Sequence, residues 1–306
     1  MPGGGERRVD MKVLILGAGA GGGLPQWNCG CTQCNAARSG EIASMTQSSI
    51  AVSANGRDWA LINASPDLRR QLQSTPSLYP RSLRDSPLRA VLVTNGDIDH
   101  VAGLLTLRES QPFDLFATPA IHKVLADNPV FLALSPDRVD RREIALDQTF
   151  ELTDGLSVRV FAVPGKVPLY LEGETVKTDL VGEQTVGVEL RAGERRVYYI
   201  PGCADVPDWL VDRVRGADLI LFDGTLWSDD EMLRAGLGKK TGRRMGHVPV
   251  TGDGGSLAAF DNAGIGRRVY VHLNNSNPLT DPRSAEATAA RAAGWQIGHD
   301  GMEIDL

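Results

Sequence analysis

The sequence has no excess of positive charge and few aromatic residues. It contains 38 acidic against 32 basic residues, a formal net charge of −6, and its aromatic content is 6%. A protein that binds nucleic acid through the phosphates needs a basic face, and one that stacks bases needs aromatic side chains. We therefore expect no nucleic-acid partner.

Long hydrophobic runs are missing as well. The longest uncharged stretch, 13–37, is long enough to cross a bilayer, but glycine, proline, glutamine, asparagine and cysteine interrupt it. The sequence also shows no signal-peptide pattern. We expect no membrane insertion and a cytoplasmic location, where cysteines are more often metal ligands than disulfide partners.

Short apolar runs alternate with helical patterns along all 306 residues, and no repeat or linker divides them. The pattern predicts one α/β domain over 11–306, preceded by a flexible N-terminal extension, 1–10. Strands are predicted at 12–16, 49–53, 59–62, 90–93, 156–161, 185–190, 197–200, 219–222 and 269–272. Helices are predicted at 66–73, 101–109, 119–126, 207–213, 256–263 and 282–293.

A glycine motif follows the first predicted strand. Gly17-x-Gly19-x-x-Gly22 matches the dinucleotide-binding fingerprint, in which the glycines let the backbone approach a pyrophosphate. That motif should open a helix, but here Pro25 and a cysteine cluster follow. We expect no dinucleotide cofactor, and instead a tight turn that brings the backbone close to a buried group.

Three cysteines lie within six residues, as Cys29, Cys31 and Cys34. This spacing suits a tetrahedral zinc ion, and a site closed by a fourth protein ligand would be structural. The fourth ligand is either Cys203 or a polar side chain from the C-terminal half. The alternative is that all three cysteines are ordinary free thiols.

An acidic loop follows the apolar run 90–93. Side chains at the carboxyl end of a buried strand project into the cleft where α/β proteins place their chemistry. Asp97, Asp99 and His100 lie on this loop and are candidate metal ligands. The alternative is an aspartate that caps the following helix, with a histidine packed beside it.

Polar side chains recur at other strand ends. His272 ends a second apolar strand and Asp223 ends a third, while His247 precedes a predicted helix. His299 lies near the C-terminus, and His122, on a surface-type helix, is given no role. Strand-end groups that recur in this way indicate one shared site at a sheet edge.

The strand-loop-helix segment resembles the metallo-β-lactamase superfamily. The positions of its His-x-His-x-Asp-His signature read Asn95, Asp97, Asp99 and His100 here. The segment GAGAGGGLPQWNCGCTQC is similar to the start of the phosphodiesterase branch, which carries a structural zinc. The resemblance implies a four-layer αβ/βα sandwich with metal at the strand-end edge. It also places Asn275 where that branch has a zinc-binding histidine.

Within this superfamily, the sequence resembles the coenzyme PQQ synthesis protein B family. The resemblance extends from residue 12 to the end and includes WNCGCTQC, TNGDIDHVAGLLTLRE, VPGKVPLY, YIPGCAD, FDGTLW, MGHVP and VHLNNSNP. It implies a role in pyrroloquinoline quinone (PQQ) biosynthesis, with hydroxylation of the tyrosine in a Glu–Tyr unit cut from a precursor peptide. The expected partner is this peptide-derived substrate or PQQ. A homodimer is a further expectation.

The sequence departs from the hydrolase pattern at the first metal position. Two histidine positions hold Asn95 and Asp97, and the third holds Lys166, whose ammonium would repel a cation. The position of the bridging aspartate falls near Cys203 and lacks a carboxylate unless Asp205 replaces it. Because a two-metal hydrolase needs both halves of its site, we expect no two-metal hydrolysis.

The second metal position keeps Asp99, His100 and His272. Two histidines and one carboxylate are the facial ligand set of non-haem iron(II) oxygenases, so Fe²⁺ or another divalent ion is expected here. Asp97 is a further ligand or orients a histidine. Asp223 and His247 are assigned roles in proton handling.

Lys166 and the basic stretch 239–244 are candidates to meet substrate carboxylates, although a solvated loop explains the stretch equally well. The hypothesis is therefore an iron-dependent oxygenase. A non-catalytic carrier for PQQ or its precursor is the main alternative, and a one-metal hydrolase is the third.

Overall fold

The protein, described by a computed structural model for residues 11–173, 177–178 and 180–306, contains two seven-stranded β-sheets. The predicted extension 1–10 lies outside the described residues. In spatial order, the first sheet contains β14 (Met302–Asp305), β1 (Lys12–Gly17), β2 (Ser49–Ser53), β3 (Trp59–Ile62), β4 (Leu88–Leu92), β5 (Phe113–Ala117) and β6 (Val139–Glu143). The second contains β13 (Trp295–Ile297), β12 (Arg267–Val271), β11 (Leu219–Asp223), β10 (Arg195–Ile200), β9 (Leu180–Ala192), β8 (Leu156–Gly165) and β7 (Thr149–Thr153).

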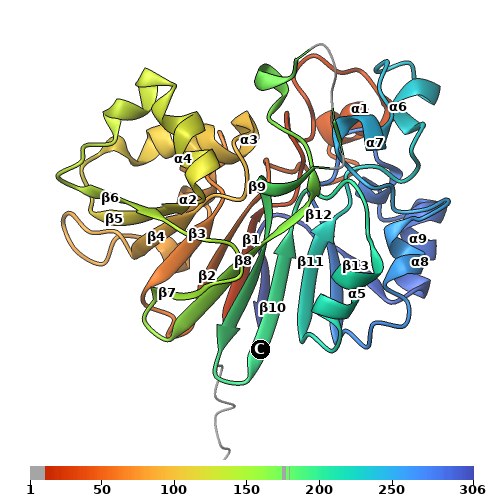
Figure 1. Ribbon diagram of the computed structural model, residues 1–306. Helices are drawn as coiled ribbons and strands as arrows, with labels where there is room; N and C mark the ends of the chain where they lie inside the picture. The colour runs from red at the N-terminus through yellow and green to blue at the C-terminus, as the bar shows by residue number, and fades with distance from the viewer. Residues whose placement is uncertain (1–10, 174–176, 179) are drawn as a thin grey trace, which may run out of the picture.

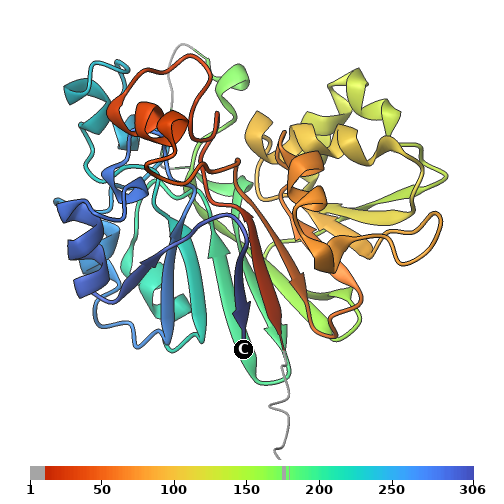
Figure 2. The same cartoon turned by 180° about the vertical axis from the view of Figure 1, so that it is seen from behind.

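Helices cover the outer faces of both sheets (Figure 1). The α-helices are α1 (Thr32–Ser39), α2 (Leu68–Gln73), α3 (Ile98–Val101), α4 (Pro119–Ala126), α5 (Asp208–Val214), α6 (Glu231–Arg234), α7 (Gly242–Met245), α8 (Ser256–Ala259) and α9 (Ala285–Ala292). Short 3-10 helices are η1 (Pro76–Leu78), η2 (Ala102–Arg108), η3 (Pro129–Ala133), η4 (Leu169–Leu171) and η5 (Pro278–Thr280). Figure 2 shows the first sheet from behind, with α2 and α4 on one side of the molecule and α9 on the other. The predicted four-layer sandwich is confirmed.

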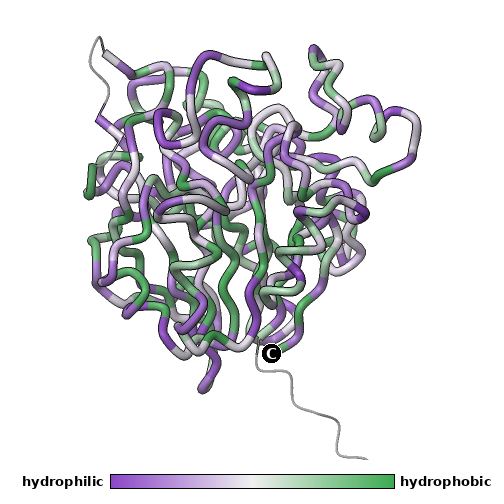
Figure 3. The backbone as a smooth tube through the Cα atoms, turned by 90° about the vertical axis from the view of Figure 1, so that its right-hand side faces the viewer, coloured by the Kyte–Doolittle hydropathy of each residue, from purple (hydrophilic) through white to green (hydrophobic). Residues whose placement is uncertain are grey.

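Both faces of the central strands are buried. Along β1, Val13 and Ile15 belong to the core between the two sheets, whereas Leu14 and Leu16 belong to the core under α2 and α4. Side chains alternate between the faces of a strand, so a strand covered on both faces is apolar throughout. Figure 3 shows hydrophobic residues concentrated along the strands and hydrophilic residues in the outer loops.

Two predicted elements near the strand-end edge differ from those in the structure. The helix predicted at 101–109 is a 3-10 segment, η2, because the backbone is pressed against a neighbouring loop. The Gly103 amide donates to the Ala64 carbonyl at 2.8 Å, and a Cβ on Gly103 would lie 2.0 Å from the Ser65 carbonyl oxygen. The strand predicted at 269–272 ends at Val271, because His272 takes a left-handed φ of 57°.

The ends of several strands meet at one edge of the sandwich. Strand β4 runs into the acidic loop, β11 ends at Asp223, and β12 is followed by His272. This edge is the upper one in Figure 1, where α1, α6 and α7 also lie, and the C-terminus is at the opposite end. Within the described residues, no helix has the length and hydrophobicity needed to cross a membrane.

Candidate metal centres

Asp99, His100 and His272 come together at this edge. Nε2 of His272 lies 3.2 Å from Oδ2 of Asp99, and Nε2 of His100 lies 3.7 Å from the same oxygen. One potential ligand atom from each side chain lies within 4.8 Å of the other two. His100 and His272 are 1% and 5% exposed, so the three groups share a space with little water.

Asn95 orients His100. Its Oδ1 lies 2.8 Å from Nδ1 of His100 and also accepts the Asp97 amide at 2.9 Å. An amide oxygen only accepts, so Nδ1 carries the proton and Nε2 presents a lone pair. This buried Nε2 has no hydrogen-bond partner among the described residues. A buried acceptor without a donor is costly unless a cation fills the position, so the geometry fits a metal ion.

Thr225 orients His272. Its hydroxyl donates a hydrogen bond to Oδ1 of Asp223 at 2.6 Å and lies 2.8 Å from Nδ1 of His272, from which it accepts a hydrogen bond. The other carboxylate oxygen of Asp223 lies 2.7 Å from Nδ1 of His247, whose ring stacks on His272 with the centroids 5.1 Å apart. Asp223 therefore fixes both histidines, one directly and one through Thr225.

The pKa values of Asp99, His100 and His272 depend on one another. Burial raises the pKa of Asp99, but His100 and His272 lower it more, so the pKa ends well below its usual range. Burial lowers the pKa of His100 to about 4, despite the nearby Asp99 charge. Burial also opposes the charged form of His272, but the hydrogen bond to Asp99 and the charges of Asp99, Asp223 and Asp97 together outweigh burial and raise the pKa of His272. Without a metal ion, the proton therefore resides on His272.

Metal binding is expected to depend on pH through His272 and not through His100. A metal ion binds neutral imidazole, so at pH 6, below the raised pKa of His272, it must displace about one proton from His272, and the number falls as the pH rises through that pKa. Affinity falls up to about tenfold for each pH unit below the raised pKa of His272. Calorimetry of zinc binding in buffers of different ionisation enthalpy measures the released protons, using protein whose cysteine cluster is already filled. Release of two protons at pH 6 would contradict this assignment.

A cavity of about 350 Å³ opens beside these three side chains. Asp97, Lys166 and His247 line it, together with the apolar side chains of Leu169, Met232 and Met245. The capping alternative, which assigned Asp99 as the cap, is wrong, because Asp99 lies inside α3. Asp97 takes the N-cap position without a side-chain capping hydrogen bond. Burial, followed by the Asp99 charge, raises the pKa of Asp97.

The glycine-rich turn after β1 lies against the site. A Cβ on Gly21 would be 3.5 Å from the Asp99 carboxylate, so this turn brings the backbone close to a buried group, as the sequence predicts. The Ala20 amide donates to the Leu273 carbonyl, and the Leu273 amide donates to the Ala18 carbonyl, both at 2.8 Å. The turn thereby fixes the segment that begins at His272.

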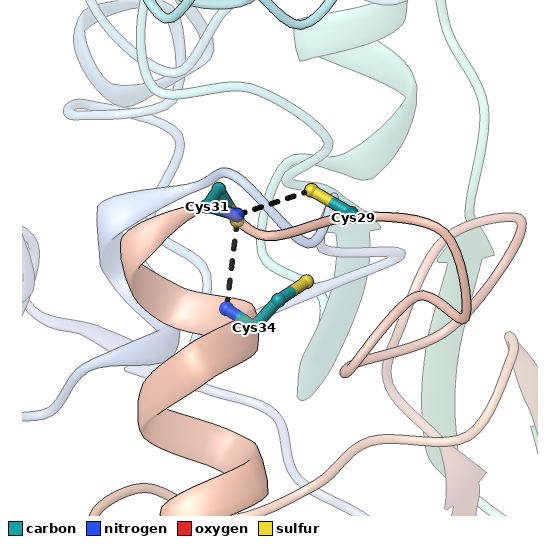
Figure 4. Close-up of side chains that lie close together, drawn as sticks. All are labelled: Cys29, Cys31 and Cys34. Atoms are coloured by element: carbon teal, nitrogen blue, oxygen red, sulfur yellow. Dashed lines mark hydrogen bonds between the residues drawn. The ribbon is translucent and has the colours of Figure 1, made fainter.

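Cys29, Cys31 and Cys34 form a second candidate metal site, at the start of α1 (Figure 4). Their sulfur atoms lie within 4.8 Å of one another. The amides of Gln26, Cys31 and Cys34 each donate to a cluster sulfur at 3.4 Å. Burial opposes the thiolate of Cys29, but the Cys31 amide and the side chains of Cys31, Cys34 and Asn275 together outweigh burial and lower the pKa of Cys29. Burial raises the pKa of Cys31 to about 11. The donor set suits a zinc ion, which binds thiolates.

Asn275 lies against the cysteine cluster, and Cys203 does not. Nδ2 of Asn275 lies 3.2, 3.6 and 3.3 Å from the sulfurs of Cys29, Cys31 and Cys34. Cys203 instead lies beside Asp223, whose carboxylate accepts its amide at 2.9 Å. The four-sulfur site is therefore wrong. Asn275, a polar side chain from the C-terminal half, faces the three sulfurs through its amide NH2, which donates hydrogen bonds and does not ligate a metal.

Replacing Asn275 by histidine is expected to tighten zinc binding at the cluster. The asparagine occupies the open corner of the three sulfurs but presents an amide NH2 that does not ligate a metal, whereas imidazole nitrogen is a standard zinc donor. We expect zinc loss to a competing chelator to slow by about tenfold or more. Unchanged or faster zinc loss would show that the side chain at 275 does not face the metal.

Three other residues considered in the sequence lie outside both candidate metal sites. His299 is exposed, with Nδ1 3.0 Å from the Asp300 carbonyl. His122 is buried, not on the surface, and its Nε2 lies 3.0 Å from the Arg142 carbonyl, a structural contact. Asp205 points to Arg243 at 3.5 Å and is largely exposed, so it does not replace the missing bridging aspartate.

Sequence reasoning missed two orienting groups. Nothing in the sequence indicates the role of Thr225 beyond its place two residues after Asp223. Asn95 was interpreted only as a replacement of a metal-binding histidine. A third missed residue is Glu172, which lines the cavity and pairs with Lys166 at 2.9 Å. Its sequence surroundings, a loop rich in proline and charge, gave no indication of this position.

The comparisons agree with this architecture. A family model described as "Beta-lactamase superfamily domain" matches residues 58–273. The chain is 58% identical to "Coenzyme PQQ synthesis protein B" of Ruegeria pomeroyi over 97% of this chain and 100% of that protein. It is 54% identical to the protein of the same name from Rhizobium meliloti, over 98% and 100% of the two chains.

Solved structures extend the comparison. The structure of Zn(2+)-bound PqqB from Methylobacterium extorquens matches with a TM-score of 0.95 and 53% identity, covering 96% of this chain and 100% of that one. A diphosphatase from the PhnP family matches with a TM-score of 0.68 at 20% identity over 97% of both chains, a likeness of fold alone. The chain belongs to the coenzyme PQQ synthesis protein B family, within the β-lactamase superfamily.

Proposed function

We propose that this member of the PQQ biosynthesis family is an iron-dependent oxygenase that hydroxylates the tyrosine ring of a Glu–Tyr precursor. One observation supports this most strongly. Asp99, His100 and His272 converge, whereas Asn95 and Lys166 stand where a hydrolase would hold its first metal. Two histidines and one carboxylate leave coordination positions open for other ligands, as oxygenases require.

The protein's own residues prepare this site. Asp99 supplies a carboxylate that stays ionised, and Asn95 and Thr225 direct the two Nε2 atoms toward it. An iron(II) ion held there would supply the one-electron chemistry with O₂ that protein side chains lack. The apolar side chains that line the cavity provide a surface for an aromatic ring.

Proton handling is assigned to Asp97 and His247. Hydroxylation replaces a ring hydrogen, so a base in the cavity must take up a proton as the ring regains its aromatic character. Asp223 holds His247 at 2.7 Å, which fixes the ring beside the cavity. Burial raises the pKa of Asp97, and this carboxyl lines the same cavity, so it is a second candidate to take up the proton.

Oxygen consumption tests the proposal. Protein is loaded with iron(II) without oxygen, its iron is quantified, and Glu–Tyr, ascorbate and ¹⁸O₂ are added. One oxygen atom enters the ring and the other leaves as water, with two electrons and two protons from ascorbate. We expect uptake equal to the hydroxylated product, with one labelled atom in each product molecule. Zinc-loaded protein is the control. An iron-filled site that gives no product would overturn the proposal.

A carrier role is a second candidate, favoured by a different observation. Lys166, Lys240 and Arg244 gather beside the cavity and suit a ligand with several carboxylates, such as PQQ. Replacing His100 by alanine separates the two functions. A carrier lacking this imidazole should still support PQQ production in cells, whereas an oxygenase should not.

A further inference from the structure

Three cationic side chains converge on one carboxylate at the wall of the cavity. Nζ of Lys166 lies 2.9 Å from Oε1 of Glu172, and Nζ of Lys240 lies 3.5 Å from Oε2. Nη2 and Nη1 of Arg244 lie 3.4 and 3.5 Å from the same Oε2. These residues come from the end of β8, from α7 and from the loop that precedes α7, so the fold gathers them from separate segments.

The charges of this cationic group, Lys166, Lys240 and Arg244, are not balanced. Among the described residues, Glu172 is the carboxylate that pairs with all three cations, and the charge of Asp97 also interacts with that of Lys166. Burial raises the pKa of Glu172, but Lys166 leads the cations that lower it below its usual range, so the carboxylate is charged. Counted over the described residues, three positive charges therefore face two carboxylates.

The contacts to Glu172 are of two kinds. The Lys166 contact has the length of a charge-assisted hydrogen bond, about 2.7–2.9 Å. The contacts of Lys240 and Arg244 are longer, 3.5 and 3.4 Å, and their side chains are 40% and 39% exposed. Long, half-exposed ion pairs contribute little to stability. Lys240 and Arg244 therefore retain donors for another carboxylate.

The cationic group is close enough to the metal site to act on the same ligand. Lys166, Glu172 and Lys240 line the cavity that His100 and His272 also line. A small acidic molecule could therefore have its reacting group beside the histidines and a carboxylate beside these cations at the same time.

We propose that Lys240 and Arg244, supported by Lys166, form the subsite for a carboxylate of the substrate, and that Glu172 occupies this subsite as an internal stand-in. The inference deepens the proposed function and rests on it in one respect, that the ligand is an acidic dipeptide. The glutamate side chain of Glu–Tyr is the carboxylate assigned to the subsite. Binding draws Lys240 and Arg244 from Glu172 to the ligand.

Binding to zinc-loaded protein tests the subsite without turnover. Calorimetry with Glu–Tyr and with Gln–Tyr compares two ligands that differ only in this carboxylate. We expect Glu–Tyr to bind about tenfold more tightly. Lys240→Gln and Arg244→Gln should each remove most of this preference. Lys239→Gln is the matched control, because Lys239 is exposed and carries the same charge one residue away.

The Glu172→Gln variant tests whether Glu172 occupies the carboxylate subsite in the absence of ligand. Removing the internal carboxylate frees the cations, so Glu–Tyr should bind several-fold more tightly, and Gln–Tyr should not. Weaker binding of Glu–Tyr to this variant, equal binding of both dipeptides by the unaltered protein, or no binding of either would overturn the subsite. If the preference holds but iron-loaded protein consumes no oxygen, the oxygenase fails and the subsite stands.

Discussion

Replacing His272 by asparagine is expected to empty the strand-end metal site and abolish product formation. The change removes one of three ligands but keeps a residue that tolerates the left-handed φ of 57°. Loss of an orienting partner alone costs about 10–100-fold in metal affinity, so loss of a ligand should cost at least about 100-fold. Metal titration and the oxygen-uptake assay measure the two effects.

His299→Asn is the matched control for this variant. His299 is an exposed histidine outside the cavity, so its replacement should leave metal affinity and product formation unchanged. Thr225→Val serves as an intermediate case, because it removes the hydroxyl that orients His272 and keeps the ligand. Metal affinity of His272→Asn equal to that of the unaltered protein would show that this histidine is not a ligand.

Replacing Cys34 by serine is expected to release the cluster zinc and to destabilise the N-terminal part of the sandwich. Cys34 is 0% exposed and packs in the core between the sheets, so the loss affects both the metal and the packing around α1. A helix of eight residues is not stable alone, and α1 needs this anchor. We expect the Tm to fall by on the order of 10 °C.

Cys203→Ser makes the same chemical change at another cysteine that is 0% exposed. Its sulfur donates to the Asp205 carbonyl and takes no part in the cluster, so this variant should keep its zinc. Zinc content and thermal unfolding compare the two variants. If Cys34→Ser retains one equivalent of zinc and the original Tm, the cluster is not a structural metal site.

The apolar strands could be predicted because their signal is local. The run 90–93 is buried on both faces, and a continuous apolar run reports this directly. Strand β6 was not predicted, because it is an edge strand with four exposed residues and its sequence has the charged composition of a loop. Helix α1 was also missed, since its residues are mostly polar or small and only Cys34 and Ala37 are buried.

The ligands were visible in the sequence, and the groups around them were not. Asp99, His100 and His272 are residue types that bind metals, and each stands at a strand end. Thr225 and Glu172 act only through partners that are distant in sequence, and no local pattern marks such a role. The resemblance to a known superfamily supplied the layer order, which residue patterns alone did not contain.

The short segment after β12 has a consequence for how the holoprotein assembles. His272 faces one candidate metal site, and Asn275, three residues later, lies against the other. A chelator that strips zinc from the sulfurs should therefore also misplace the imidazole, and the two ions should not load independently. We therefore expect that zinc must fill the cysteine cluster before iron binds tightly at the strand-end site. Iron added first should bind there with low affinity.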